Sequence, residues 1–214
     1  MTDVAEPLPP AAAVAVPGLP GPPPTTQAPL KPPATIVPLK LLPVSAALII
    51  FAIVAIAANW LWALDFLHVA AGGLWTGIDL FVGLIVGPIV GGMSIPARVE
   101  FSTRFMPKML VIMPTLVTLT LAAGWQLGVH LGTVNSEFPN HGWVVASYIV
   151  VGVMAVIALG ILEPANLGVI FELRKPRPNG EIIAKLMKRF IYTAGITGLM
   201  QVATLVIMTK LATG

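Results

Sequence analysis

The sequence has no cysteine, and only 10% of its 214 residues are Asp, Glu, Lys or Arg. The absence of thiols excludes a disulfide framework, iron–sulfur clusters, thiolate zinc sites, c-type haem attachment and a cysteine nucleophile. The charged fraction is less than half of the roughly 25% typical of soluble globular domains, and 57% of the residues are hydrophobic. This composition excludes an ordinary soluble enzyme and leaves His, Asp, Glu, Met and hydroxyl groups as ligands or catalysts.

Motifs of hydrolases and nucleotide-driven enzymes are also missing, since the sequence has no GxSxG, P-loop, HExxH or paired-carboxylate pattern. If the chain is an enzyme, the class that remains is an oxidoreductase. The formal net charge is +3, and the twelve Lys and Arg residues flank apolar segments. Their placement is typical of membrane topology signals, so we expect no nucleic-acid binding.

Proline is concentrated at one end of the chain, where 13 of the 21 prolines lie in the first 43 residues. Residues 1–40 combine Pro and Ala without a hydrophobic period, which predicts a disordered, extended cytoplasmic tail. The acidic start and the short apolar run at 11–16 do not match a cleavable signal peptide. We expect this tail to be a tether or, alternatively, a docking segment for a protein partner through its PxxP spacing.

From residue 41 the apolar signal is nearly continuous and predicts an all-α, polytopic helix bundle in a lipid bilayer. A hydrocarbon core of about 30 Å takes about 20 helical residues. Division at this length gives five transmembrane helices, one N-terminal helix and a four-helix core, at about 41–59, 66–92, 105–129, 142–162 and 183–208. No Gly or Pro separates the first two, so one long bent helix is the alternative.

The basic residues predict the orientation of these spans. Five spans place eleven of the twelve Lys and Arg residues on one side and Lys210 alone on the other. By the positive-inside rule, we expect a bacterial cytoplasmic (inner) membrane protein with its N-terminus in the cytoplasm and its C-terminus outside. Fusing the first two helices would split the basic residues between the two sides, so the orientation supports a break near Asn59.

All three histidines fall near the outer side in this topology. His68 lies one turn inside the second helix, His130 ends the third, and His141 begins the fourth. Imidazoles that face one another at one depth are suited to ligate b-type haem, copper or zinc. These residues are therefore candidate cofactor and metal ligands. The alternatives are a hydrogen-bonded packing role for His68 and solvated interfacial positions for His130 and His141.

The second helix also carries a stripe of residues at helical spacing. Its members, at steps of 3, 4, 3 and 4, are Asp65, His68, Gly72, Trp75 and Asp79. Residues at this spacing share one face of a helix, and we expect that face to point into the bundle. Gly72 removes side-chain bulk beside His68, either to admit a flat macrocycle or to let a neighbouring helix approach closely.

Asp79 is predicted near the middle of the bilayer, where an ionised carboxylate is costly and no span offers a Lys or Arg partner. We expect its carboxyl to be protonated or hydrated. It is a candidate catalytic group, as a proton relay or as a hydrogen-bond partner of a quinone. The alternative is a structural bond to a hydroxyl across the bundle, such as that of Thr115, Thr118 or Thr197.

Two further stripes predict packing. The thioether stripe of Met106, Met109 and Met113 has the ligand chemistry for Cu(I), but Met113 precedes His130 by 17 residues, about 25 Å of helix, so the two cannot form one site. We expect these methionines in the core. A small and polar face on the last helix predicts a helix contact, and its members are Tyr192, Gly195, Gly198, Gln201 and Thr204.

The run Leu64-Asp65-Phe66-Leu67-His68, with 74–77, 101–105 and Gly124, resembles the membrane core of the copper-resistance CopD and HemJ-like superfamily. The resemblance covers the second to fifth helices. It implies a four-helix inner-membrane bundle that holds haem b or handles copper, with His68 as the family's helix histidine. The later core lysine of HemJ-like proteins has no counterpart, so protoporphyrinogen oxidation is not carried over.

These observations combine into one functional expectation. We expect a redox or electron-transfer protein that binds haem b through His68, with His130 or His141 opposite, and contacts a quinone near Trp75 and Asp79. The first alternative is a copper-handling membrane protein. The second is a non-catalytic membrane subunit or assembly factor of a larger complex.

Overall fold

The computed structural model describes residues 37–213, and within this range it contains helices and no strand. Most of the predicted tail at 1–40 lies outside the described residues. The helices are α1 (Leu42–Ala57), α2 (Leu61–Phe81), α3 (Gly87–Gly92), α4 (Ile95–His130), α5 (His141–Ile157), α6 (Glu163–Leu173) and α7 (Gly180–Thr213). Two π-helical turns, η1 (Val82–Val86) and η2 (Ala158–Leu162), join α2 to α3 and α5 to α6.

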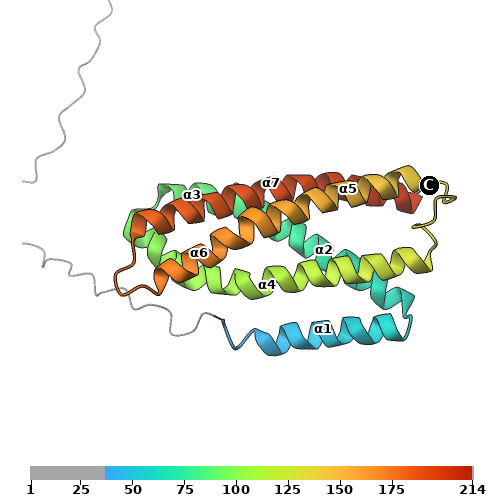
Figure 1. Ribbon diagram of the computed structural model, residues 1–214, viewed down its shortest axis with the longest axis horizontal. Coiled ribbons are helices and arrows are strands. Elements are labelled where there is room, and N and C mark those ends of the chain that lie inside the picture. Colours follow the sequence, from blue (N-terminus) through green and yellow to red (C-terminus); the bar gives the residue numbers. More distant parts are fainter. Residues whose placement is uncertain (1–36, 214) are drawn as a thin grey trace, which may run out of the picture. The chain divides into compact units, whose positions relative to one another are not determined.

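Four continuous helical segments are long and apolar enough to cross a membrane (Figure 1). They are Leu61–Gly92, Ile95–His130, His141–Leu173 and Gly180–Thr213. Their 32 to 36 residues correspond to about 48–54 Å, so each exceeds a hydrocarbon core of about 30 Å. The four segments confirm an all-α bundle that fits an integral membrane protein. The predicted fifth span corresponds to α1, an apolar helix of only 16 residues.

The helices extend further than the hydropathy pattern indicated. The predicted loop at 93–104 is helical from Ile95, and the predicted loop at 163–182 is helical up to Leu173 and again from Gly180. Hydropathy marks the thickness of the hydrocarbon, whereas helical hydrogen bonding continues into the headgroup region. The Asn179 side chain starts α7, since its Oδ1 accepts the backbone N–H groups of Glu181 and Ile182 at 2.9 and 3.3 Å.

The break between α1 and α2 is a turn centred on Asn59, so the predicted separation of the first two helices is confirmed. Asn59 has a φ of 54°, in the left-handed region. The N–H of Trp60 bonds to the carbonyl of Ala55 at 3.0 Å, and that of Asn59 to the carbonyl of Ile56 at 3.2 Å. This is the Schellman pattern of a helix C-terminus, which Asn supports when Gly is absent.

The turn gives a first prediction, for a pair of substitutions at Asn59. Asn59→Ala is expected to lower the unfolding free energy by about 1 kcal/mol more than Asn59→Gly, because a Cβ without a polar group disfavours the left-handed conformation. The Asn59 side-chain oxygen Oδ1 lies 2.7 Å from His130 Nε2, and both variants lose this contact, so their difference isolates the backbone effect. Thermal unfolding in mild detergent measures it, and equal midpoints would contradict the backbone explanation.

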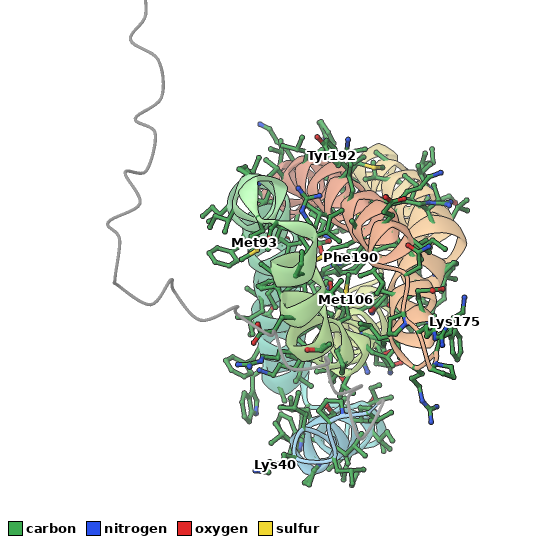
Figure 2. All side chains as sticks on the ribbon, turned by 90° about the vertical axis from the view of Figure 1, so that its left-hand side faces the viewer. Lys40, Met93, Met106, Lys175, Phe190 and Tyr192 are labelled. Carbon is green, nitrogen blue, oxygen red and sulfur yellow. The ribbon has the colours of Figure 1, made fainter. Side chains whose placement is uncertain are left out.

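The two ends of the bundle differ in charge. The start of α1, the α3–α4 junction and the α6–α7 loop lie at one end, and the α1–α2 turn, the α4–α5 loop and the end of α7 lie at the other (Figure 1). We call the first the basic end. Figure 2 views it directly, and its residues are Lys40, Arg98, Arg104, Lys108, Arg174, Lys175, Arg177, Lys185, Lys188 and Arg189.

The core lies along the contacts that α4 and α7 make with the other helices. α4 packs on α1, α2 and α6, while α7 packs on α2, α5 and α6, and α4 and α7 also touch each other. The methionine stripe is buried here, since Met106, Met109 and Met113 are exposed by 8% or less. This burial confirms that the stripe packs in the core.

Candidate functional site

Glycines bring the backbones of η1 and of the end of α2 into direct contact with α7. A Cβ added at Gly83 would lie 2.4 Å from the Cα of Gly195. One added at Gly198 would lie 3.0 Å from the backbone nitrogen of Leu80. The predicted contact face on the last helix is therefore confirmed at Gly195 and Gly198. Tyr192 departs from it, because its side chain is 64% exposed.

This close approach assembles a hydrogen-bonded cluster around Asp79, which is only 2% exposed. Its Oδ2 accepts bonds from Trp75 Nε1 at 3.0 Å, Thr197 Oγ1 at 3.0 Å and Gln201 Nε2 at 2.8 Å. Of the hydroxyls considered for Asp79, that of Thr197 forms the bond, whereas that of Thr115 donates to the carbonyl of Val111. Neutral donors on one oxygen thus replace the basic partner that the spans lack.

The helix changes its geometry directly after this cluster. The π-helical turn η1 begins three residues beyond Asp79, and its buried side chains, Val82 and Val86, pack in the core. η1 packs against α7, as does the α2 turn that carries Asp79. Such π-turns inside α-helices are frequent at functional sites, where they change the direction of side chains along the helix.

His68 is fixed by α4. Its Nδ1 lies 2.8 Å from the carbonyl oxygen of Thr120. A carbonyl only accepts, so Nδ1 carries the proton and Nε2 of the neutral ring keeps a free lone pair. The ring rests on Gly124, where an added Cβ would lie 2.4 Å from Nδ1. His68 therefore has the predicted packing bond and still offers a Lewis base, with no other hydrogen bond among the described residues.

A pocket of about 330 Å³ lies beside this base, between α2, α4, α5 and α7. Its polar wall includes His68, Trp75, Thr76, Gln201 and Thr204. Its apolar wall includes Val151, Met154 and Leu205. Trp75 and Gln201 line the pocket and also bond to Asp79, so the carboxyl lies directly behind the wall. The Oε1 of Gln201 is buried and accepts no bond within residues 37–213.

The predicted interior stripe of α2 is only partly interior. Trp75 and Asp79 are buried, while His68 and Gly72 are half-buried. Gly72 lies against α4, since its added Cβ would meet the side chain of Thr120 at 3.3 Å. Asp65 is exposed, which corrects its predicted place in the interior, because the buried face of the first turns of α2 is formed by Ala63, Leu64 and Leu67 instead.

The other two histidines lie apart from His68. His130 Nε2 lies 2.7 Å from Asn59 Oδ1, so His130 joins the end of α4 to the α1–α2 turn. It follows Gly124 by six residues, which is about 9 Å along α4 and on another face of the helix. His141 begins α5 about 15 Å before the pocket residue Val151. Over residues 37–213, no three His, Asp or Glu side chains form a group able to hold a metal ion.

No family model, curated protein or solved structure matches this chain. The resemblance to the CopD and HemJ-like superfamily therefore stays an expectation from the sequence, based in part on the short motifs around His68, Trp75 and Gly124. In the structure these motif residues are close together, because His68 rests on Gly124 and Trp75 lines the same pocket as His68.

Proposed function

We propose that this membrane protein binds a lipid-soluble hydroquinone, the reduced form of a quinone, in the pocket beside His68. The supporting observation is the free Nε2 of His68, which its bond to the Thr120 carbonyl leaves as an acceptor at the pocket wall. A hydroquinone hydroxyl is a donor and matches this acceptor, whereas a quinone carbonyl does not. We also propose that the protein lies in a bacterial inner membrane with its basic end in the cytoplasm.

The size and lining of the pocket fit a single aromatic ring with an apolar tail. Its volume of about 330 Å³ is near the lower limit of ligand cavities, which hold about 300–1,000 Å³. The α5 and α7 side of the wall is mostly apolar, with Met154, Leu205 and Met208. An isoprenoid tail suits such a surface. Asp79, behind Trp75 and Gln201, is the proton relay that we propose for this site.

Binding of a hydroquinone and its methyl ether tests the proposal. A short-tailed benzohydroquinone is expected to bind at least about tenfold more tightly than its dimethyl ether, because the ether cannot donate and leaves the base unpaired. His68→Phe is expected to remove this preference. The matched control is His130→Phe, since His130 does not line the pocket. Equal binding of the two compounds to the unmodified protein would refute the proposal.

Haem b is a second candidate for the same pocket. A protein haem ligand commonly has its other ring nitrogen bonded to a carbonyl, as His68 does with Thr120. Among the described residues His68 is the only histidine that lines the pocket, and no Lys or Arg lines it to receive haem propionates. A Soret band after haem supplementation that is lost in His68→Phe would favour haem over the hydroquinone. His130 and His141 do not line this pocket, so this second candidate includes only His68 as a histidine ligand.

A further inference from the structure

A second cavity, of about 590 Å³, lies on the other side of α7. We call it the glycine groove, because Gly83, Gly87 and Gly91 recur along one side of it and Gly195 lies on α7. Leu84, Ile196 and Leu199 form apolar walls. The groove shares no lining residue with the pocket beside His68, so it is a separate site.

The groove extends from the hydrocarbon core of the bilayer into the headgroup region. The uncharged segment 190–208 of α7 has 19 residues, about 28 Å, which matches the hydrocarbon thickness. Lys188 therefore lies at headgroup depth, and Leu199 lies about 16 Å deeper. One continuous cavity thus connects an apolar floor in the hydrocarbon to the basic end of the bundle.

Two cationic side chains line the headgroup end of the groove, and no Asp or Glu is among its lining residues. Arg98 donates Nε to the carbonyl of Met93 at 3.0 Å and Nη2 to that of Gly91 at 2.6 Å. Three of the five guanidinium N–H groups are left for another acceptor. Lys188 Nζ lies 5.5 Å from the ring centroid of Tyr192, a cation–π contact that positions the ammonium group.

We propose that the glycine groove binds one anionic phospholipid. Its phosphate lies between Arg98 and Lys188, and one acyl chain lies over the glycines toward Leu199. The charge at the headgroup end and the apolar floor match the two parts of such a lipid, and basic pockets between membrane helices bind anionic headgroups. A second membrane helix would match the small residues but would leave the two cations without a counter-charge.

Native mass spectrometry of the full chain with added lipids tests this site. We expect phosphatidylglycerol to bind about fivefold more tightly than phosphatidylcholine with the same acyl chains, as one well-placed cation near a membrane surface predicts. Lys188→Gln is expected to reduce the ratio to near one. The matched control is Lys185→Gln, which removes an exposed charge one turn away on α7 that does not line the groove. An equal effect of the two variants, or no preference in the unmodified protein, would overturn the proposal.

A substitution that fills the groove tests the proposal that an acyl chain lies over its glycines. A Cβ added at Gly91 meets no atom within 4 Å, and Gly91 lines the groove, so Gly91→Leu is expected to reduce the space in the groove without a backbone clash at the Cβ. Gly92 has the same open surroundings but does not line the groove, so Gly92→Leu is the control. Gly91→Leu is expected to reduce binding of both lipids several-fold and Gly92→Leu to leave it unchanged. Inorganic phosphate is expected not to compete; full competition by phosphate would point to an ion site and overturn the lipid assignment.

Discussion

Asp79→Leu is expected to lower the unfolding free energy by about 2–6 kcal/mol. The substitution removes the only acceptor that the structure gives to Trp75 Nε1 and Gln201 Nε2, and each buried donor without a partner costs about 1–3 kcal/mol. The loss of Asp79 costs less free energy at Thr197, because its hydroxyl can also donate to the carbonyl of Ala194 at 2.9 Å or of Thr193 at 3.1 Å. Reversible unfolding in mixed micelles with increasing SDS measures the change.

Two further variants separate the acceptor from the charge. In Asp79→Asn the amide oxygen takes the position of Oδ2 and accepts the same three bonds, so we expect a loss below about 1 kcal/mol. Asp65→Leu changes an exposed carboxyl on the same helix and is expected to stay within about 0.5 kcal/mol of the unmodified protein. If Asp79→Asn is as unstable as Asp79→Leu, the cluster depends on the charge of the carboxylate and not on acceptor geometry.

Hydropathy predicted the helices but not where they end. A mean over about 20 residues responds to the hydrocarbon, whereas helix ends are set by single residues. Asn59 shows the difference, because the sequence offered no Gly or Pro at the α1–α2 break and the residue that ends α1 is an Asn in the left-handed conformation. Asn is the common substitute for Gly there, so this signal was present in the sequence.

Spacing on one helix predicted which residues lie close together better than shared depth between helices did. His68, Trp75 and Asp79 were identified from their 3.6-residue period, and the structure connects Trp75 to Asp79 and to the pocket beside His68. The depth of a residue in the bilayer does not determine the direction in which its side chain points around the helix axis. Six residues separate Gly124, which faces His68, from His130, and that step turns the side chain by about 240° onto the face that meets Asn59.

Of the two α7 residues that donate to Asp79, the sequence predicted one as a hydrogen-bond partner. The sequence names Thr197 among the hydroxyls that could bond to Asp79, whereas it places Gln201 only on a face for helix packing. An amide in an apolar span must find a bond within the protein, and at four residues from Thr197 it lies on the same face. That reasoning identifies Gln201 as a second donor to Asp79. It does not give the register of α7 against α2, which depends on the contact between Gly83 and Gly195.

Gly83→Ala is the second substitution with a large expected effect. The new Cβ would lie 2.4 Å from the Cα of Gly195 and 3.0 Å from its nitrogen, so no side-chain rotation relieves the clash, and η1, with the end of α2 that precedes it, must separate from α7. Overpacking of this kind costs about 1–3 kcal/mol and sometimes more. The matched control is Gly77→Ala, where the added Cβ meets no atom within 4 Å and higher helix propensity is expected to stabilise α2 slightly.

The effects of Gly83→Ala and Asp79→Leu are expected to be less than additive. Thr197 and Gln201 follow Gly195 on α7, so separating α7 from α2 at Gly83 also lengthens their bonds to Asp79. The double variant then loses the same bonds once, and a double-mutant cycle should show a coupling of about 0.5–3 kcal/mol. Additive losses would mean that the acid cluster keeps its bonds when the glycine contact opens, and that the close approach of α2 and α7 is not what holds the donors on Asp79.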